Sequence, residues 1–279
     1  MRFLFLADMQ IGAYASFSGL TEADVARLAV QGLKVRAAPK SYSLEWDIRR
    51  LDAAIVVANR LRPDLVIVGG DMVNDAADAA QRDAFFQAIG HLDPDIPIRW
   101  GPGNHDVTYD WSAPTVESLR QYRDRFGPDY YAFDHGPAAF VVWNTAVAFD
   151  PTLVPGEWEA QLAFLEIALE GAAAHGRQPI LIGHHPLFVE TPDEADTYWN
   201  IPTARRRPVL DLIHRFGVRI GLAGHLHRGA WARDGAFEMV TSGPVGYPLG
   251  DDPSGFRVVE VTPEGIAHAY HALDVLDGD

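Results

Sequence analysis

Near its start the chain reads Phe3-Leu4-Phe5-Leu6-Ala7-Asp8-Met9-Gln10, an apolar run of strand length that stops at an acidic residue. Continuous apolarity, without alternation, is typical of a strand buried on both faces. Four later segments repeat the pattern of an apolar run followed at once by metal-ligand side chains: Gly69-Gly70-Asp71, Gly103-Asn104-His105-Asp106, Gly183-His184-His185-Pro186 and Gly224-His225-Leu226-His227. Together the segments offer aspartates, histidines and two amide side chains, which is the inventory that a pair of divalent ions needs.

Strand and helix patterns alternate along most of the chain. Apolar runs of strand length occupy residues 3–6, 65–68, 96–100, 139–143, 180–182 and 218–222. Helical periodicity is found at residues 45–60, 79–92, 115–126, 157–175 and 203–216. After Gly224 the pattern becomes strand and turn, over residues 229–233, 237–241, 256–261 and 266–270. This order predicts the α/β class, with an antiparallel finish on a mixed sheet.

The candidate ligands follow strand ends, and ligands of open α/β sheets gather outside the carboxyl ends of the strands. The residues that fall within about six positions of such an end are Asp8, Asp71, Asn104, His184 and His225. Taken singly, each has an ordinary structural explanation, because an aspartate after a strand is most often a helix cap or turn residue. Taken together in this order, they predict a metal centre at one edge of the sheet.

Composition limits the classes of protein to consider. The chain has 279 residues, of which 48% are hydrophobic, and the candidate ligands spread from position 8 to position 227, which predicts a single domain over residues 1–279. Two segments, at about 13–43 and 187–202, are insertions that the scaffold does not explain. Within the first, Thr21-Glu22-Ala23-Asp24 is a capping signature that predicts a short helix.

Charge and cysteine content exclude several kinds of partner. The chain has no cysteine, so any metal must be held by oxygen and imidazole nitrogen. The formal charge of −15 disfavours nucleic acid, whose binding depends on lysine and arginine. The N-terminal apolar stretch is too short for a signal peptide and no later stretch approaches a membrane span, which predicts a cytoplasmic protein with no membrane partner. The sequence does not indicate an oligomeric state.

The order of these segments resembles the calcineurin-like metallophosphoesterase superfamily, whose motifs are Asp-x-His, Gly-Asp, Gly-Asn-His-Asp/Glu, Gly-His and Gly-His-x-His. The resemblance covers nearly the whole chain and implies a four-layer αββα sandwich of mixed sheets with a dimetal site at the carboxyl edge. It implies two divalent ions, of Mn, Fe or Zn. The implied ligands are Asp8, Gln10, Asp71 and His227 for the first ion, and Asp71, Asn104, His184 and His225 for the second. Asp71 would bridge the ions, because a carboxylate has two oxygens.

Gln10 departs from the superfamily pattern, which mostly has histidine at this position. An amide oxygen is a weaker donor than imidazole to a borderline metal, so either the first ion binds less tightly or the site is lost. The phrases around Gln10, His185-Pro186-Leu187-Phe188-Val189-Glu190, Tyr198-Trp199-Asn200 and residues 250–259 resemble the calcineurin-like phosphoesterase domain-containing protein 1 subgroup, which also carries glutamine there. Its members are described as serine/threonine protein phosphatases. The resemblance supports phosphatase chemistry better than any particular substrate.

The resemblance also suggests a mechanism. A hydroxide that bridges the ions would attack phosphorus, His105 would protonate the leaving oxygen as general acid, and Asp106 would fix the tautomer and orientation of His105. On the substrate side, His185 could touch the substrate, Tyr198 could pack against the leaving group, and Arg205 could clamp phosphate. Alternatively, His185 is a packed histidine and Arg205 belongs to a solvated helix face.

The leading interpretation is a phosphomonoesterase that acts on a phosphorylated small molecule or a phosphoprotein. A phosphodiesterase or nucleotide hydrolase could use the same constellation. An interpretation from a different class is a non-catalytic binding module that keeps the fold and has lost the metal chemistry. His105 and Asp106 argue against such a module, since a scaffold without catalysis has no need of a proton donor beside the metals.

Overall fold

The computed structural model describes residues 1–108 and 113–273, and the strands among them form two mixed sheets. The first sheet has the order β11-β10-β1-β2-β3, from β1 (Arg2–Leu6), β2 (Leu65–Gly69), β3 (Ile98–Gly101), β10 (Gly255–Thr262) and β11 (Gly265–Ala272). The second has the order β4-β5-β6-β7-β9-β8, from β4 (Tyr131–His135), β5 (Ala138–Val142), β6 (Gln178–Ile182), β7 (Ile220–Ala223), β8 (Ala230–Asp234) and β9 (Phe237–Thr241).

The parallel strands are neighbours in each sheet, at one side of the first sheet and in the middle of the second, and they end level with one another. In the first sheet β1, β2 and β3 are parallel, with Leu6 opposite Val68 and Val68 opposite Trp100. In the second, β5, β6, β7 and β9 are parallel, with Ile182 opposite Leu222. The loops that leave β1, β2 and β3 therefore start from a common edge, as do those that leave β6 and β7.

The two sheets face each other across an apolar core. Successive side chains of a strand point to opposite faces, so Phe3 and Phe5 of β1 lie between the sheets while Leu4 and Leu6 pack toward the helices. The ring of Phe3 meets that of Phe140 from the other sheet edge to face, with centroids 5.1 Å apart. This burial on both faces is the reason that the first strand reads as a continuous apolar run.

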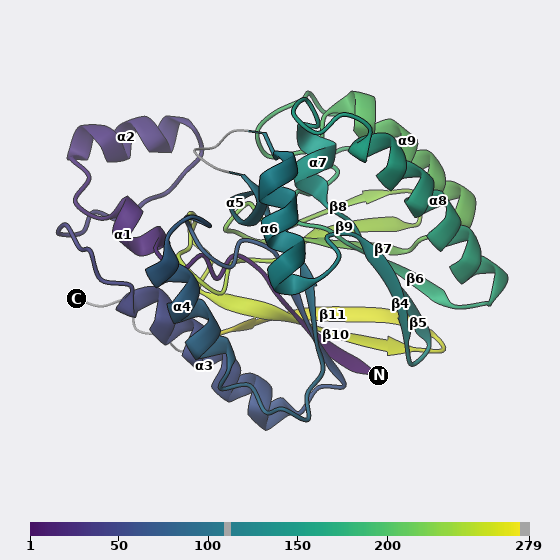
Figure 1. Ribbon diagram of the computed structural model, residues 1–279, viewed down its shortest axis with the longest axis horizontal. Coiled ribbons are helices and arrows are strands. Elements are labelled where there is room, and N and C mark those ends of the chain that lie inside the picture. Colours follow the sequence, from purple (N-terminus) through teal and green to yellow (C-terminus); the bar gives the residue numbers. More distant parts are fainter. Residues whose placement is uncertain (109–112, 274–279) are drawn as a thin grey trace.

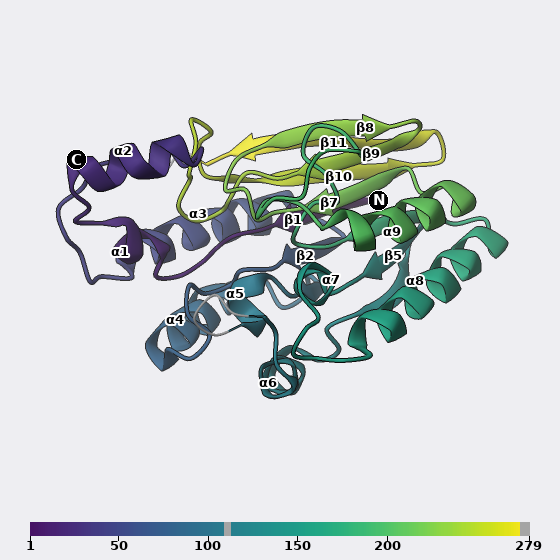
Figure 2. The same ribbon diagram turned by 90° about the horizontal axis from the view of Figure 1, so that it is seen from above.

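Helices cover the outer faces. Figure 1 shows α3 (Glu45–Leu61) and α4 (Ala79–Ile89) on one side of the sheets and α8 (Glu157–Ala174) and α9 (Thr203–Phe216) on the other, and Figure 2 shows the same arrangement from above. The order of helix, sheet, sheet and helix confirms the predicted four-layer αββα sandwich. Shorter helices are α1 (Ala13–Phe17), α2 (Glu22–Val30), α5 (Asn104–Val107), α6 (Val116–Phe126) and α7 (Thr145–Phe149).

The structure agrees with the strand and helix patterns except at a few short elements. The capping signature begins α2 as predicted, because the Thr21 hydroxyl accepts from the Asp24 backbone nitrogen at 3.2 Å and the Thr21 nitrogen donates back to the Asp24 carboxylate. Strand β4 was not predicted, and neither were α1, α5 and α7. Each of these elements spans only four or five residues, which is too short to establish a periodicity.

Within residues 1–108 and 113–273, no helix has the combination of length and apolarity needed to cross a bilayer.

Candidate metal centre

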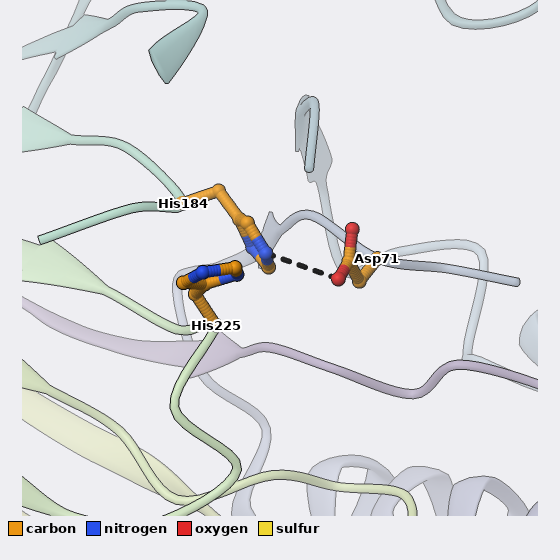
Figure 3. Close-up of side chains that lie close together, drawn as sticks. All are labelled: Asp71, His184 and His225. Atoms are coloured by element: carbon orange, nitrogen blue, oxygen red, sulfur yellow. Dashed lines mark ion pairs between the residues drawn. The ribbon is translucent and has the colours of Figure 1, made fainter. Parts of the chain in front are cut away.

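The loops from both sheets bring their candidate ligands together at the carboxyl edge. Two groups of ligand atoms, each with all members within 4.8 Å of one another, are Asp71, His184 and His225, and Asp8, Asp71 and His227. Figure 3 shows the first group, in which the His184 and His225 rings from the second sheet face the Asp71 carboxylate from the first. Asp71 belongs to both groups, which is what a bridging ligand requires.

The backbone is strained at the candidate ligands. Among the described residues, six that are not glycine have positive φ, and five of them are candidate ligands: Asp8 (54°), Gln10 (38°), Asp71 (53°), His225 (71°) and His227 (50°). Such left-handed conformations cost on the order of 1–3 kcal/mol each and cluster at functional sites. Here they reverse the chain just beyond the strand ends, so that the side chains point inward.

Two glycines make room for the carboxylates. A Cβ atom at Gly103 would lie 2.1 Å from Oδ1 of Asp71, and one at Gly224 would lie 2.5 Å from Oδ2 of Asp8. Both distances are far below van der Waals contact, so neither position can hold a side chain unless the neighbouring aspartate moves. The glycines of the Gly-Asn-His-Asp and Gly-His-x-His segments are therefore needed for packing against the carboxylates.

Hydrogen bonds between loops hold the carboxylates in place. Both oxygens of Asp8 accept from the backbone nitrogen of His225 at 3.0 Å, which ties the loop after β1 to the loop after β7. Oδ1 of Asp71 accepts from the backbone nitrogen of His105 at 2.9 Å, which ties the loop after β2 to the loop after β3. The two carboxylates are thus positioned before any ion binds.

Backbone carbonyls set the tautomers of the candidate histidine ligands. Nδ1 of His184 lies 2.9 Å from the Gly69 oxygen, and Nδ1 of His227 lies 2.6 Å from the Tyr247 oxygen. His225 is turned the other way, with Nε2 3.0 Å from the carbonyl oxygen of Tyr198. A carbonyl only accepts, so each of these nitrogens carries a hydrogen, and the opposite nitrogen is the one that would offer its lone pair to an ion.

Three buried atoms at this edge have no hydrogen-bond partner among the described residues: Oε1 of Gln10, Oδ1 of Asn104 and Nε2 of His184. Each is the atom through which its side chain would ligate a metal. A buried polar atom left unpaired costs about 1–3 kcal/mol. Nε2 of His184 lies 3.1 Å from Asp71 Oδ2 and 3.8 Å from Asp8 Oδ1 as an ion pair, so this cost falls on the two amide oxygens. The site therefore fits divalent ions held by oxygen and nitrogen donors.

Burial and close spacing shift the pKa values of the carboxylates and imidazoles in the cluster. Burial raises the pKa of Asp8 and also acts to raise that of Asp71, but His184 and then His105 hold the pKa of Asp71 well below its ordinary value. Burial lowers the pKa of His184, but the Asp71 and Asp8 carboxylates outweigh it and raise the pKa to about 9. Burial, together with His184, lowers the pKa of His225 to about 3.

His105 lies beside the candidate ligands, but Asp106 is not the group that holds its ring. Nδ1 of His105 lies 2.7 Å from the backbone oxygen of Asn74, and Nε2 lies 3.1 Å from Nε2 of Gln10. The Asp106 carboxylate accepts from the backbone nitrogens of Asp71 (2.7 Å), Met72 (3.0 Å) and Gly103 (2.8 Å). Asp106 therefore holds the loops that carry Asp71 and Asn104, and the expectation that it orients His105 is corrected. Burial and the Asp71 carboxylate raise the pKa of Asp106 to about 7.

A pocket opens next to Asn104. Its described lining residues are Asn104, Thr108, Ala113, Pro114, Ala146, Phe149, Asp150, His185 and Tyr198. His185 stacks on Phe149 with ring centroids 5.0 Å apart, and the ring of Tyr198 packs at 4.8 Å from that of His225. The structure thus places His185 and Tyr198, both expected to touch substrate, in the wall of a pocket that adjoins the candidate ligands.

Arg205, by contrast, is not part of this wall. Its guanidinium donates to the backbone oxygens of Ala148 and, at 2.6 Å, of Phe149. The last carbonyls of a helix lack intrahelical partners and attract a cation, so Arg205 caps the end of α7. Both the expected phosphate clamp and the alternative of a solvated helix face are corrected: Arg205 supports the backbone of Phe149, which lines the pocket.

Thr145 is a site residue that the ligand pattern did not reveal. Its hydroxyl oxygen accepts from the backbone nitrogens of His184 at 3.1 Å and His185 at 2.9 Å, and lies 3.1 Å from Nδ1 of His185. Both lone pairs are used, so the single hydroxyl hydrogen points to Nδ1 and the proton of neutral His185 lies on Nε2. The signal was present, since Thr145 follows the apolar run at 139–143, but threonine is not a typical metal ligand.

Comparison with known proteins agrees with this geometry. A family model described as calcineurin-like phosphoesterase matches residues 1–229. The chain is 34% identical over 241 residues to serine/threonine-protein phosphatase CPPED1 of Danio rerio, which covers 83% of this chain and 77% of the relative. It is 32% identical over 242 residues to the protein of the same name from Homo sapiens, covering 83% and 76%.

Solved structures share the fold. A dimetal phosphatase from Danio rerio superposes with a TM-score of 0.61 at 16% identity, covering 98% of this chain and 96% of that chain. A purple acid phosphatase from yellow lupin superposes with a TM-score of 0.65 at 16% identity, covering 98% of this chain and 51% of that chain. At such identities the likeness shows the fold alone.

Proposed function

The chain belongs to the calcineurin-like phosphoesterase family and is a metal-dependent phosphatase, and we propose that it hydrolyses phosphomonoesters at a centre of two divalent ions. The observation that carries the proposal is that Asp71 belongs to both groups of ligand atoms. The first ion would be held by Asp8, Gln10, Asp71 and His227, and the second by Asp71, Asn104, His184 and His225. When bound, the ions would activate the attacking water and neutralise the phosphoryl oxygens.

His105 would supply the proton to the leaving oxygen. It is 8% exposed and follows the candidate ligand Asn104, which places its ring at the border of the centre. The Asn74 backbone oxygen accepts a hydrogen bond from Nδ1 of His105 at 2.7 Å, so the proton that His105 would transfer resides on Nε2. Once Nε2 has given up its proton, it can accept from the Gln10 amide at 3.1 Å, which stabilises the neutral ring.

The pocket beside Asn104 would receive the leaving group. Its described lining is mostly apolar and contains one carboxylate, Asp150, but no lysine or arginine. A nucleotide with further phosphates would need cations in this wall, whereas the alkyl or aryl group of a simple monoester would not. Because the curated relatives are named serine/threonine-protein phosphatases, a phosphoserine or phosphothreonine side chain is the substrate that we propose.

A substrate panel tests this proposal. The full chain, reconstituted with Mn²⁺, would be assayed on para-nitrophenyl phosphate, its bis ester, cyclic and linear nucleotides, and phosphoserine peptides. We expect turnover of the aryl phosphate and the phosphopeptides to exceed that of the bis ester and the nucleotides. Preference for the bis ester or for nucleotides would favour the diesterase or nucleotide hydrolase instead, and no turnover of any ester would favour a binding module.

A further inference from the structure

We infer that Asn74 is a positioning residue that orients the Gln10 amide with its oxygen toward the first ion, an inference that rests on the two-ion centre proposed above. A terminal amide carries an oxygen that can ligate and a nitrogen that cannot, at nearly equivalent positions. A half-turn of the amide would therefore exchange a ligand for a pair of hydrogens facing the ion. A chain with glutamine at this position needs a means to prevent that half-turn.

The polarity of the contacts on one side determines the orientation. The Ser16 hydroxyl donates its hydrogen to the Gly12 oxygen at 3.1 Å, so it can only accept from Asn74. Nδ2 of Asn74 is the donor to it at 3.0 Å, which turns Oδ1 of Asn74 toward Gln10. Because Oδ1 only accepts, Gln10 must present Nε2, which lies 3.1 Å away.

The contacts on the other side give the same orientation. The backbone oxygen of Asn74 lies 2.7 Å from Nδ1 of His105, so Nδ1 carries the hydrogen and Nε2 of the neutral ring has a lone pair. Nε2 of Gln10 lies 3.1 Å from this lone pair. While His105 is neutral, the two hydrogens of the Gln10 amide have two acceptors, Asn74 Oδ1 and His105 Nε2. When His105 carries the proton that it would transfer, Asn74 Oδ1 alone holds the amide with its oxygen toward the ion.

The remaining atom of the amide is left for a ligand. Oε1 of Gln10 is buried and has no hydrogen-bond partner within the described part of the chain. The residue itself is 3% exposed and adopts a φ of 38°, a conformation in which residues other than glycine are rare. Asn74 thereby does for a glutamine ligand what a carbonyl or carboxylate does for a histidine ligand.

The test is titration of the metal-stripped full chain with Mn²⁺ by calorimetry, with electron paramagnetic resonance as a second readout of whether the ions are paired. We expect wild type to bind two ions and N74A to bind the first about 10–100-fold more weakly, as for other groups that orient a ligand. The second ion should bind unchanged, which also shows that the variant is folded. N74D keeps an acceptor for Gln10 and should bind at least as tightly as wild type.

N59A is the matched control, because the Asn59 amide, like that of Asn74, donates one hydrogen bond and accepts one, here to the His91 backbone oxygen and from the Asp93 backbone nitrogen. We expect it to leave both affinities unchanged. In a Q10E background either carboxylate oxygen can ligate, so N74A should no longer weaken the first ion. Equal loss from N74A in both backgrounds, or no loss in either, would overturn the inference while the two-ion centre stands. Wild type that binds one ion would overturn both.

Discussion

Replacing Thr145 with valine tests whether a hydroxyl outside the ligand set positions His184 and His185. Thr145 is fully buried, and valine has nearly its shape, so the substitution removes hydrogen bonds without leaving a cavity. The backbone nitrogens of His184 and His185 would lose the oxygen that accepts from them at 3.1 and 2.9 Å. An unpaired buried group costs about 1–3 kcal/mol, so the free energy of unfolding should fall by about 2–6 kcal/mol.

The assay is urea denaturation followed by circular dichroism, in excess chelator so that ion binding does not add to stability. In Mn²⁺, kcat/KM for para-nitrophenyl phosphate should fall about 100-fold, because displacement of catalytic groups by about 1 Å has that effect. T145S keeps the hydroxyl and serves as the control, with a loss of about 1 kcal/mol for the missing methyl and near-normal turnover. T145V with the stability and kcat/KM of T145S would refute the reasoning.

Three further predictions follow from the site. H105Q should lower kcat about 10²–10⁴-fold, as loss of a general acid does. Its ion content, measured by plasma emission spectrometry, should equal that of wild type, and a drop in ion content would instead make His105 a ligand. R205A should lower the free energy of unfolding by about 1–3 kcal/mol, because the Arg205 guanidinium bonds the Ala148 and Phe149 carbonyls. A raised KM with unchanged stability would instead favour the phosphate clamp. G103A should bind fewer ions than wild type, because the added Cβ would lie 2.1 Å from Asp71 Oδ1. G171A is the control and should bind the wild-type number, because a Cβ there has nothing within 4 Å. Equal ion content in the two variants would contradict the packing argument.

The parts of the site that could be predicted lie directly beyond strand ends. Apolar runs mark strands buried on both faces, and the parallel order puts Asp71, His184 and His225 at one edge whatever the details of the loops. The prediction therefore needed only local patterns and a rule about sheets. The positive φ angles at Asp8 and Asp71 could not be read from composition, because most residues that adopt such angles elsewhere are glycine.

The parts that could not be predicted depend on contacts between distant loops. Arg205 was placed on a helix correctly, but its direction is decided by α7, a short helix that the sequence pattern did not reveal. Asp106 follows His105 in sequence, yet it bonds the backbone of the loop after β2, while the His105 ring is held by Asn74 from that same loop. Two side chains that are adjacent in sequence need not contact each other, so the sequence alone does not show which group holds the His105 ring.

Ion stoichiometry in the D71N variant tests the central claim most directly. The claim is that Asp71 joins two ions, as its membership of both ligand groups indicates. An asparagine has one oxygen that can ligate and no charge, so it cannot bridge in the same way. Under Mn²⁺-replete conditions, plasma emission spectrometry should find two ions per chain in wild type and at most one in D71N. Two ions in both proteins, or at most one in wild type, would contradict the account.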